Sequence, residues 1–299
     1  MKDVRCSLCE SDLFELQILD IDYIEFHRIL PSNTMHHVHK ANIYYQSTRK
    51  PQKVIFKRTM RSHELKILKM LQELFKGHSK PHMSLLAFVE DKQSNATVMM
   101  LERGKIDLHG FRIQTDGLIS SSISTAIVRS LVEKVSMLHK NDLAHLDLSI
   151  ENVLLTNKEV FLIDFENARL LPHEEEFHFN TDTKPMCNAG KENFMSSEQH
   201  SGRAWNGFQS DVFAIGIIAF WLFFGTLPFN SHKSRECKWL QTNQVEEVVL
   251  WFGSPFSDDL YTKQTRLALQ FIAQCCSHAS VRPRHAEALL AHELFTIKK

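Results

Sequence analysis

The feature that most restricts the fold of this 299-residue chain is the apolar run VFAIGIIAFWLFFG, residues 212–225. The run is bounded by Asp211 and Gly225, and it is shorter than the ~20 residues that a membrane-spanning helix needs. An apolar segment of this length that does not span a bilayer has to be buried in protein. We therefore predict a buried core helix here, inside a domain large enough to surround it.

The overall composition, 43% hydrophobic and 23% charged, is that of an ordinary globular protein. The length allows one large domain with two lobes or two small domains. Formal net charge is zero and the chain has no basic stripe. No general electrostatic attraction to nucleic acid or to an anionic membrane is therefore expected, and we predict neither as a partner.

The first residues predict an intracellular protein, cytoplasmic or nuclear. Met1 to Glu10 is polar and lacks the apolar core of a signal peptide, so the cysteines are expected to be reduced thiols. Cys6 and Cys9 form a CxxC pair, but no second pair follows at the spacing of a zinc site. A flexible N-terminal extension over residues 1–22 is favoured over a metal site.

The first half of the chain contains short runs of β-branched and aromatic residues between turn residues, a pattern typical of strands. The predicted strands are YIEFHRIL (23–30), HKANIYYQ (39–46), KVIFK (53–57), SLLAFVED (84–91) and ATVMML (96–101). One helix is predicted among them, from Met60 to Phe75. Apolar residues recur along it at helical spacing: Leu65, Leu68, Leu71, Leu74 and Phe75.

The second half is predicted to be mostly helical. A helix from about Ser122 to Lys140 has an apolar face made of Ile123, Ile127, Leu131, Val135 and Leu138. Further helices are expected at about 210–225, 241–251, 262–276 and 284–291, and two short strands at VLL and VFLI, residues 153–155 and 160–163. The pattern predicts an α+β fold with a small β-rich lobe, a connector near residues 102–106 and a large helical lobe.

Between the first two of these helices lies HLDLSIENVLLTNKEVFLIDFENARLL, residues 145–171, which carries three residues suited to catalysis. Asp147 can accept a proton from a hydroxyl nucleophile. Asn152 and Asp164 supply hard oxygen ligands of the kind that Mg²⁺ binds together with phosphate oxygens. An isolated loop aspartate more often caps a helix, so the chemistry depends on finding the three residues together and in this order.

This stretch resembles the eukaryotic protein kinase family. HLDLSIEN is similar to the catalytic loop HRDxxxxN, and DFE at residues 164–166 is similar to DFG. The resemblance implies that Asp147 is the catalytic base, that Asn152 and Asp164 hold the metal, and that the cofactors are ATP and Mg²⁺. It also implies the two-lobed kinase fold over residues 23–297, with a small lobe at about 23–101 and a large lobe at about 107–297.

The resemblance continues through the second half of the chain. FMSSE, residues 194–198, stands where the family has a YMAPE-like motif, and Asp211 matches the aspartate that opens the central helix and braces the catalytic loop. The closing segment VRPRHAEALLAHELF, residues 281–295, supplies Arg282. The family pattern implies an ion pair between Arg282 and Glu198.

In the small lobe, Lys57 corresponds to the strand lysine that contacts the ATP phosphates, and Glu64 to the helix glutamate that orients it. Only six residues separate them, so the first half of the family's helix is expected to be missing. The alternative is an exposed strand lysine and a solvated helix glutamate. The other positions that the resemblance assigns to nucleotide binding are Val38, Glu102, Arg103 and Leu154.

Several positions depart from the family pattern. The three glycines of the phosphate-binding loop fall on Pro31, Asn33 and His36, which weakens backbone contacts to phosphate. Leu146 replaces the arginine that pairs with an activation-segment phosphate, so ordering of that segment is not expected to need a phosphate. Glu166 replaces the glycine of DFG.

One departure suggests a compensation. Serine/threonine members carry a lysine where this chain has Ser149, and a threonine near it where this chain has Lys191. We hypothesise that Lys191 reaches toward Asp147 and supplies the missing positive charge, since phosphoryl transfer depends on positioning and charge stabilisation. The alternative is that Lys191 is an exposed loop lysine.

Two classes of function follow. The complete set Lys57, Asp147, Asn152 and Asp164 favours a protein kinase that transfers the γ-phosphate of Mg-ATP to serine or threonine hydroxyls of a protein substrate. The alternative is a pseudokinase that acts as a scaffold or allosteric binding module, which the departures at the phosphate loop and around Asp147 favour. The identity of the protein substrate does not follow from the sequence.

Overall fold

A computed structural model describes residues 21–30, 36–48, 50–60, 62–91, 96–117, 119–156, 159–171, 190–200, 205–228 and 263–296. The chain divides into two compact units, an N-terminal unit of residues 1–104 and a C-terminal unit of residues 105–299. The predictions for Cys6, Cys9, Pro31, Asn33 and the helix at 241–251 lie outside the described residues.

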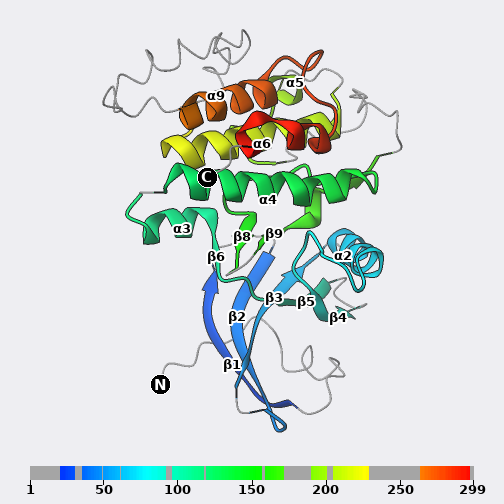
Figure 1. Cartoon of the computed structure of the whole chain (residues 1–299). Helices are drawn as coiled ribbons and strands as arrows, with labels where there is room; N and C mark the ends of the chain where they lie inside the picture. Colours follow the sequence, from blue (N-terminus) through cyan, green and yellow to red (C-terminus); the bar gives the residue numbers. More distant parts are fainter. Residues whose placement is uncertain are drawn as a thin grey trace. The chain divides into compact units, whose positions relative to one another are not determined.

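The N-terminal unit is built on a five-stranded antiparallel sheet in the order β1-β2-β3-β5-β4 (Figure 1). The strands are β1 (Ile21–Leu30), β2 (His36–Tyr45), β3 (Gln52–Thr59), β4 (Leu85–Asp91) and β5 (Ala96–Glu102). The five strands predicted from the sequence are thus confirmed. Successive strand residues face opposite sides of the sheet, and one side forms the core with Ala41, Ile43, Val54, Phe56, Val89, Val98 and Met100.

Helix α2 (His63–Leu74) is shorter than predicted. Leu65, Leu68 and Leu71 are buried as expected, but Leu74 is 47% exposed. Each step of three residues turns 300° around a helix and therefore drifts by about 60°. After three such steps Leu74 lies on the side opposite Leu65, so it does not share the buried face although it follows the same spacing.

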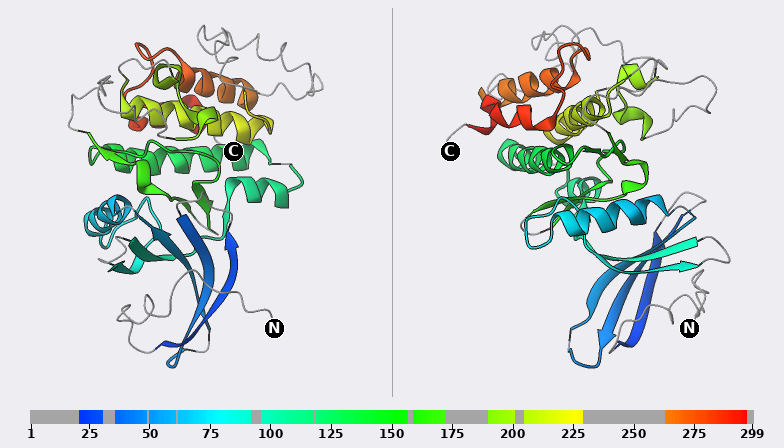
Figure 2. Two further views of the ribbon diagram at one scale, coloured as in Figure 1. Left: turned by 180° about the vertical axis from the view of Figure 1, so that it is seen from behind. Right: turned by 90° about the vertical axis from the view of Figure 1, so that its right-hand side faces the viewer.

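Three helices form the main part of the C-terminal unit: α4 (Ser121–His139), α6 (Gly207–Phe224) and α9 (Lys263–Cys276). Figures 1 and 2 show them stacked one on another, in green, yellow and orange. In α4 the predicted face is buried except at Ile123, which is 46% exposed because it lies in the first turn, at the edge of the apolar stripe. That residue was therefore assigned wrongly.

Helix α6 confirms the predicted core helix. Within the described residues it is the one helix long and apolar enough to cross a membrane, yet 83% of that stretch is buried inside the protein. Gly216 lets α9 approach closely, since a Cβ at this position would lie 2.6 Å from both Cys275 Cβ and Cys276 Sγ. The helix is therefore enclosed by its neighbours.

Short elements complete the C-terminal unit. β8 (Val153–Leu155) and β9 (Val160–Leu162) form the hairpin predicted from VLL and VFLI, and β6 (Ile106–Asp107) pairs with β8. β7 (Leu143–Ala144) pairs with β10 (Arg169–Leu170). β6, β7, β10 and the short helix α3 (Leu108–Gln114) were not predicted, because segments of two to seven residues carry too little periodicity. The helix predicted at 284–291 is the 3₁₀ helix η5 (Ala286–Ala291).

Candidate functional site

The loop between β7 and β8, residues 145–152, is fastened to α6 by Asp211. The buried carboxylate of Asp211 accepts the backbone N–H of His145 at 2.7 Å and that of Leu146 at 2.8 Å. Leu146 has a φ of 62°, a left-handed conformation that costs free energy for a residue with a Cβ. The two hydrogen bonds to one carboxylate compensate for that cost and fix the loop.

A third contact to Asp211 comes from His139 at the end of α4. Nδ1 of His139 accepts the backbone N–H of Ala286 at 3.1 Å, so the ring hydrogen is on Nε2 and donates to Asp211 at 3.1 Å. Asp211 therefore ties together α4, α6 and the start of the loop.

His145 holds the loop on its other side. Its ring is fully buried, and burial lowers the pKa of this histidine, which keeps it neutral. Nε2 lies 3.1 Å from the carbonyl of Ile163, Nδ1 accepts the backbone N–H of Asp147 at 3.3 Å, and the ring packs against Phe165. The imidazole thus joins the loop to the segment that follows β9.

Asn152 and Asp164 lie at the two ends of the β8–β9 hairpin. Nδ2 of Asn152 donates to the Asp147 carbonyl at 2.8 Å, and the Asn152 carbonyl accepts the N–H of Ile163 at 3.1 Å. Asp164 has φ 66° and ψ 67°, the left-handed region. The two backbones are therefore brought together by the hairpin, and each residue carries a side-chain oxygen.

These oxygens fit Mg²⁺ better than a metal that requires a full set of protein ligands. Over the residues that the structure describes, no group of three or more His, Cys, Asp and Glu side chains is placed to hold a metal ion. Mg²⁺ is commonly bound by one or two protein oxygens, with water and phosphate completing the shell. Asn152 and Asp164 match that requirement.

The environment of Asp147 makes its carboxylate more basic than usual. Burial and the charge of Asp164 together raise the pKa of Asp147 to about 7. Two groups oppose this rise: Asn167, whose Nδ2 donates to Asp147 Oδ2 at 3.2 Å, and Lys191 through its charge and backbone. A carboxylate with a pKa near neutrality suits a general base.

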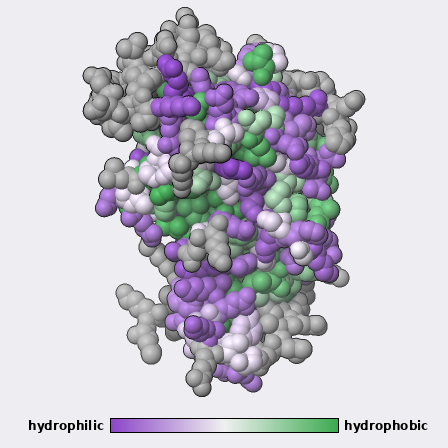
Figure 3. All heavy atoms as spheres, viewed as in Figure 1, coloured by the Kyte–Doolittle hydropathy of each residue, from purple (hydrophilic) through white to green (hydrophobic). Residues whose placement is uncertain are grey.

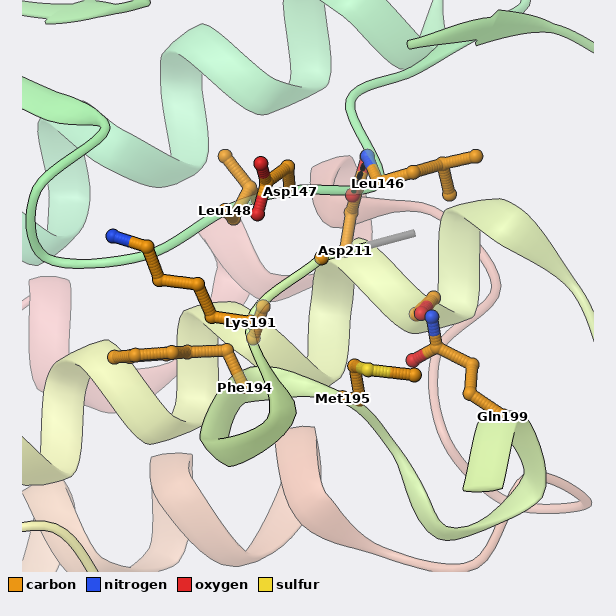
Figure 4. A pocket seen from close by; sticks show the side chains of 11 residues that line it. Leu146, Asp147, Leu148, Lys191, Phe194, Met195, Gln199 and Asp211 are labelled. Carbon is orange, nitrogen blue, oxygen red and sulfur yellow. Dashed lines mark hydrogen bonds between the residues drawn. The ribbon is translucent and has the colours of Figure 1, made fainter. Parts of the chain in front are cut away.

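Lys191 and Asp147 line the same small hollow under the loop (Figure 4). The Lys191 ammonium forms an ion pair with Glu151 at 2.8 Å, and about half of each side chain is exposed. Burial raises the pKa of Glu151, but the hydrogen bond and the charge of Lys191 outweigh it, so that pKa is lowered. Whether Lys191 takes part in catalysis stays a prediction.

Gly190, beside Lys191, was not singled out by the sequence. Its φ is +103°, and a Cβ there would lie 2.9 Å from the carbonyl oxygen of Leu146 and 3.7 Å from Asp147 Oδ1. The chain at residue 190 therefore packs directly on the loop. The sequence around Gly190 gives no sign of such a contact, whereas Asn167, also missed, directly follows the motif DFE.

Leu146, which stands where the family pattern has an arginine, packs against apolar side chains. Its side chain is buried in an apolar cluster with Ala144, Leu171, Trp205 and Phe208. The cluster joins the loop to β10 and to the start of α6. Apolar contact thus stabilises this part of the loop in the absence of a charged side chain.

The predicted ion pair between Arg282 and Glu198 is confirmed. Arg282 is almost completely buried, and its guanidinium also donates to the Ser277 carbonyl from Nε at 3.1 Å and from Nη2 at 2.8 Å. Burial raises the pKa of Glu198, but the charge and hydrogen bond of Arg282 outweigh this and lower it. The pair joins α5 (Ser197–His200) to the segment that precedes η5.

In the N-terminal unit, Lys57 on β3 forms a buried ion pair with Glu64 at 2.6 Å. The alternative of an exposed lysine and a solvated glutamate was therefore wrong. Glu64 lies in the first turn of α2, so the short separation is spanned by the end of β3 and a brief turn. A carboxylate in this position also interacts favourably with the helix dipole.

The remaining predicted nucleotide-binding residues are placed as follows. Val38 lies on β2 directly opposite Lys57. Glu102 ends β5, where its carboxylate accepts from Ser84 Oγ at 2.7 Å, and Arg103 follows it. In the C-terminal unit, Leu154 is the middle residue of β8 and is half-buried.

A larger hollow of about 320 Å³ lies elsewhere in the C-terminal unit, between α3, α4 and the β8–β9 hairpin. Its apolar wall includes Phe111, Ile123 and Ile127, and Figure 3 shows hydrophobic surface in green over α3 and the start of α4. None of the residues predicted to act in catalysis lines it. The loop at residues 145–152 is therefore the better candidate site.

Comparisons with known proteins agree with this choice. The sequence profile described as "Protein kinase domain" matches residues 33–295 of the chain. Residues expected to act in chemistry, from Lys57 to Asp164, all lie within the match. The α+β class predicted from the sequence, with a β-rich N-terminal part and a helical C-terminal part, is also the class of the matched domain.

Individual relatives are similar at low identity. Human NUAK family SNF1-like kinase 2 is 26% identical over 164 residues, which is 54% of this chain and 25% of that protein. Serine/threonine-protein kinase ppk27 of Schizosaccharomyces pombe is 26% identical over 176 residues, 55% of this chain and 43% of that protein. Striated muscle preferentially expressed protein kinase of Danio rerio is 22% identical over 272 residues, 90% of this chain and 8% of that protein. The chain thus spans less than half the length of these relatives.

Proposed function

The chain belongs to the protein kinase domain family, and from that premise we propose that it transfers the γ-phosphate of Mg-ATP to serine or threonine hydroxyls of protein substrates. The observation that carries the proposal is the state of Asp147. Its carboxylate sits on a loop fastened by Asp211 and His145, and burial together with the charge of Asp164 raises its pKa to about 7. A structural loop aspartate has no need of that combination.

In the proposed reaction, Asp147 accepts the proton of the substrate hydroxyl. The hydroxyl oxygen forms a bond to the γ-phosphorus, and the bond from that phosphorus to the β–γ bridging oxygen breaks, releasing ADP. Proton transfer by a positioned base of this kind contributes roughly 10²- to 10⁴-fold to the rate. The loop's role is to keep the carboxylate in place throughout.

Asn152 and Asp164 are the residues proposed to hold Mg²⁺, which when bound neutralises negative charge on the phosphates. Asn152 is supported by its hydrogen bond to the Asp147 carbonyl, which points its amide group into the site. Asp164 is supported by its left-handed backbone, since strained conformations of this kind gather at functional sites.

In the N-terminal unit, Lys57 is proposed to bind ATP phosphates, with Glu64 holding its ammonium in position. Val38, Glu102, Arg103 and Leu154 are proposed to contribute to nucleotide binding. Support comes from the buried Lys57–Glu64 pair, which holds the Lys57 ammonium in one place although burying two charges costs desolvation free energy.

We also propose that Lys191 supplies positive charge near the transferred phosphoryl group. Its charge already acts on Asp147, although its ammonium is paired with Glu151. The sharpest test moves the lysine from position 191 to position 149. Lys191→Ala is expected to lower the rate, and the double variant Ser149→Lys with Lys191→Thr is expected to restore it. An unchanged rate in Lys191→Ala would remove the residue from the mechanism.

Preference for serine and threonine rests on the relatives, one of which is named a serine/threonine-protein kinase. The second candidate function is a pseudokinase that binds partners without phosphotransfer. It is favoured by Pro31, Asn33 and His36, which replace glycines in the phosphate-binding loop, and by Glu166 beside Asp164.

Calorimetric titration with ATP, with and without Mg²⁺, distinguishes the two. We expect binding that requires Mg²⁺ and is lost in Asp164→Ala. Glu133→Ala is the control, because Glu133 is an exposed carboxylate on α4 that accepts from Arg129 Nε at 3.1 Å and has no proposed role in binding. Absence of binding at millimolar ATP by a folded sample would favour the pseudokinase.

A further inference from the structure

Asn167 reaches the proposed base from outside the loop that carries it. Its Nδ2 donates to Asp147 Oδ2 at 3.2 Å, from the last residue of the 3₁₀ helix η1 (Phe165–Asn167). The two residues are far apart in the sequence, so tertiary structure creates the contact. The resemblance of HLDLSIEN and DFE to the family's motifs implies no role for this asparagine.

The turn that carries Asn167 is held on both sides. Nη1 of Arg169 donates to the carbonyl of Glu166 at 3.3 Å and to that of Ala168 at 2.8 Å. The N–H of Ala168 donates to the Phe165 carbonyl at 3.1 Å. The backbone on either side of Asn167 is therefore held in place, and the amide of Asn167 extends from it to Asp147 Oδ2.

The same turn is anchored to the loop of Asp147. Phe165 is 1% exposed and its ring centroid lies 4.8 Å from that of His145. His145 in turn accepts the N–H of Asp147. Asn167 and Asp147 thus belong to one packed frame.

We propose that Asn167 is a positioning residue that sets the rotation of the Asp147 carboxylate. The inference rests on the proposed phosphotransfer. Oδ1 of Asp147 is buried on the side of Gly190, whereas the residue as a whole is partly exposed. Oδ2 is then the oxygen that a substrate hydroxyl reaches. Asn167 occupies one lone pair of Oδ2 and leaves the other directed at the hydroxyl.

An asparagine is suited to this task because its amide donates without carrying charge. A lysine or arginine at the same place would form an ion pair with the carboxylate and make it a weaker base. The amide orients the oxygen while leaving it able to take a proton.

The test compares variants of Asn167 that differ in the donor. Asn167→Leu keeps a similar volume without the N–H, and Asn167→Asp places a second carboxylate against Asp147. We expect kcat to fall about tenfold for Leu and further for Asp, since a hydrogen bond to a charged group is typically equivalent to about one to two factors of ten. KM for ATP is expected to stay within about twofold. Asn167→Gln, which retains the donor, is expected to recover part of the rate.

Asn42→Leu is the matched control. Asn42 donates its amide to a carboxylate in the same way, to Glu25 Oε2 at 3.1 Å, but on the sheet of the N-terminal unit. We expect its kcat to equal that of the wild type. The free energy of unfolding, measured for each variant in urea, identifies a structural effect.

The outcomes separate the two proposals. Phosphotransfer by the wild type with full kcat in Asn167→Leu overturns the positioning role and leaves the proposed function intact. A loss of kcat that is matched by a rise in KM and a fall in unfolding free energy also overturns it, because such a loss is structural. A folded wild type without phosphotransfer overturns both.

Discussion

The loop at residues 145–152 has an inner side, where its backbone meets Asp211, and an outer side, which carries the carboxylate of Asp147. The two sides are held in different ways. On the inner side, Asp211 accepts from two backbone N–H groups and from His139, and it is 1% exposed. On the outer side, Asp147 accepts from the amide of Asn167, and its pKa is raised to about 7 by burial and Asp164. Two aspartates that meet at one short loop therefore have very different environments.

The difference teaches how one loop combines rigidity with chemistry. A buried carboxylate that accepts from several donors, as Asp211 does, fastens the backbone that carries those donors. A carboxylate with fewer donors beside another negative charge keeps its affinity for a proton. The hydrogen bonds to Asp211 support the left-handed backbone of Leu146. Asp147, the proposed base, is the next residue along the chain.

The largest expected effect is on the inner side. Asp211→Ala leaves the N–H groups of His145 and Leu146 buried without their acceptor, and each such group costs roughly 1–3 kcal/mol. We expect the free energy of unfolding to fall by about 4 kcal/mol in urea titration. Asp211→Asn, which keeps one oxygen acceptor, is expected to lose less. Equal losses in the two variants would contradict the role of the hydrogen bonds.

Glu198 extends the same comparison to a second fastened carboxylate. Its folded-state pKa is lowered because Arg282 outweighs burial, so its contribution to stability is present above the unfolded pKa of about 4.3 and is lost as the pH falls through the folded value. Glu198→Gln should cost about 2 kcal/mol at pH 7.

Unfolding measured across the range from neutral pH to about pH 3 provides the check, since this range includes the unfolded pKa of glutamate. The wild type is expected to lose its advantage over Glu198→Gln as the pH falls. An advantage that stays constant with pH would show that the charge of Glu198 does not contribute.

Gly190→Ala tests the outer side through its backbone. An added Cβ meets the Leu146 carbonyl at 2.9 Å and the φ is positive, so we expect a loss of about 2 kcal/mol in unfolding free energy together with a lower rate of phosphotransfer. Gly77→Ala is the control, since Gly77 also has a positive φ but no atom within 4 Å of an added Cβ. The difference between the two variants measures the contact with the loop; no difference would mean that the contact carries no strain.

The smallest expected effect is at the exposed pair of Lys191 and Glu151. Surface ion pairs contribute up to about 1 kcal/mol, so Glu151→Gln should change unfolding free energy by less than that amount. Chemical denaturation at low and high salt supplies the measurement. A change above about 2 kcal/mol would show that this pair contributes to stability as the carboxylates of Asp211 and Glu198 do.

Much of the site was predictable because its residues belong to short sequence motifs with fixed spacing. Asp147, Asn152 and Asp164 follow from HLDLSIEN and DFE, and the ion pairs of Lys57 with Glu64 and of Arg282 with Glu198 are both confirmed. The strands of the N-terminal unit were predicted from β-branched runs with turn residues between them.

The rest depends on tertiary contacts that leave no local pattern. Gly190 is needed only because the Leu146 carbonyl lies against it, and Asn167 matters only because η1 folds back onto the loop. Leu74 and Ile123 follow the apolar spacing of their helices but are exposed, because the apolar stripe no longer meets the core near the end of a helix.

The central claim is that Asp147 performs chemistry that Asp211 does not, and Asp147→Asn tests it most directly. The measurement is the rate of phosphotransfer from Mg-ATP to a serine-containing protein substrate, with the free energy of unfolding determined on the same samples. The account predicts a rate loss of roughly 10²- to 10⁴-fold with unfolding free energy unchanged within about 0.5 kcal/mol. A variant that keeps the wild-type rate, or one that loses the rate only because it unfolds, would contradict the account.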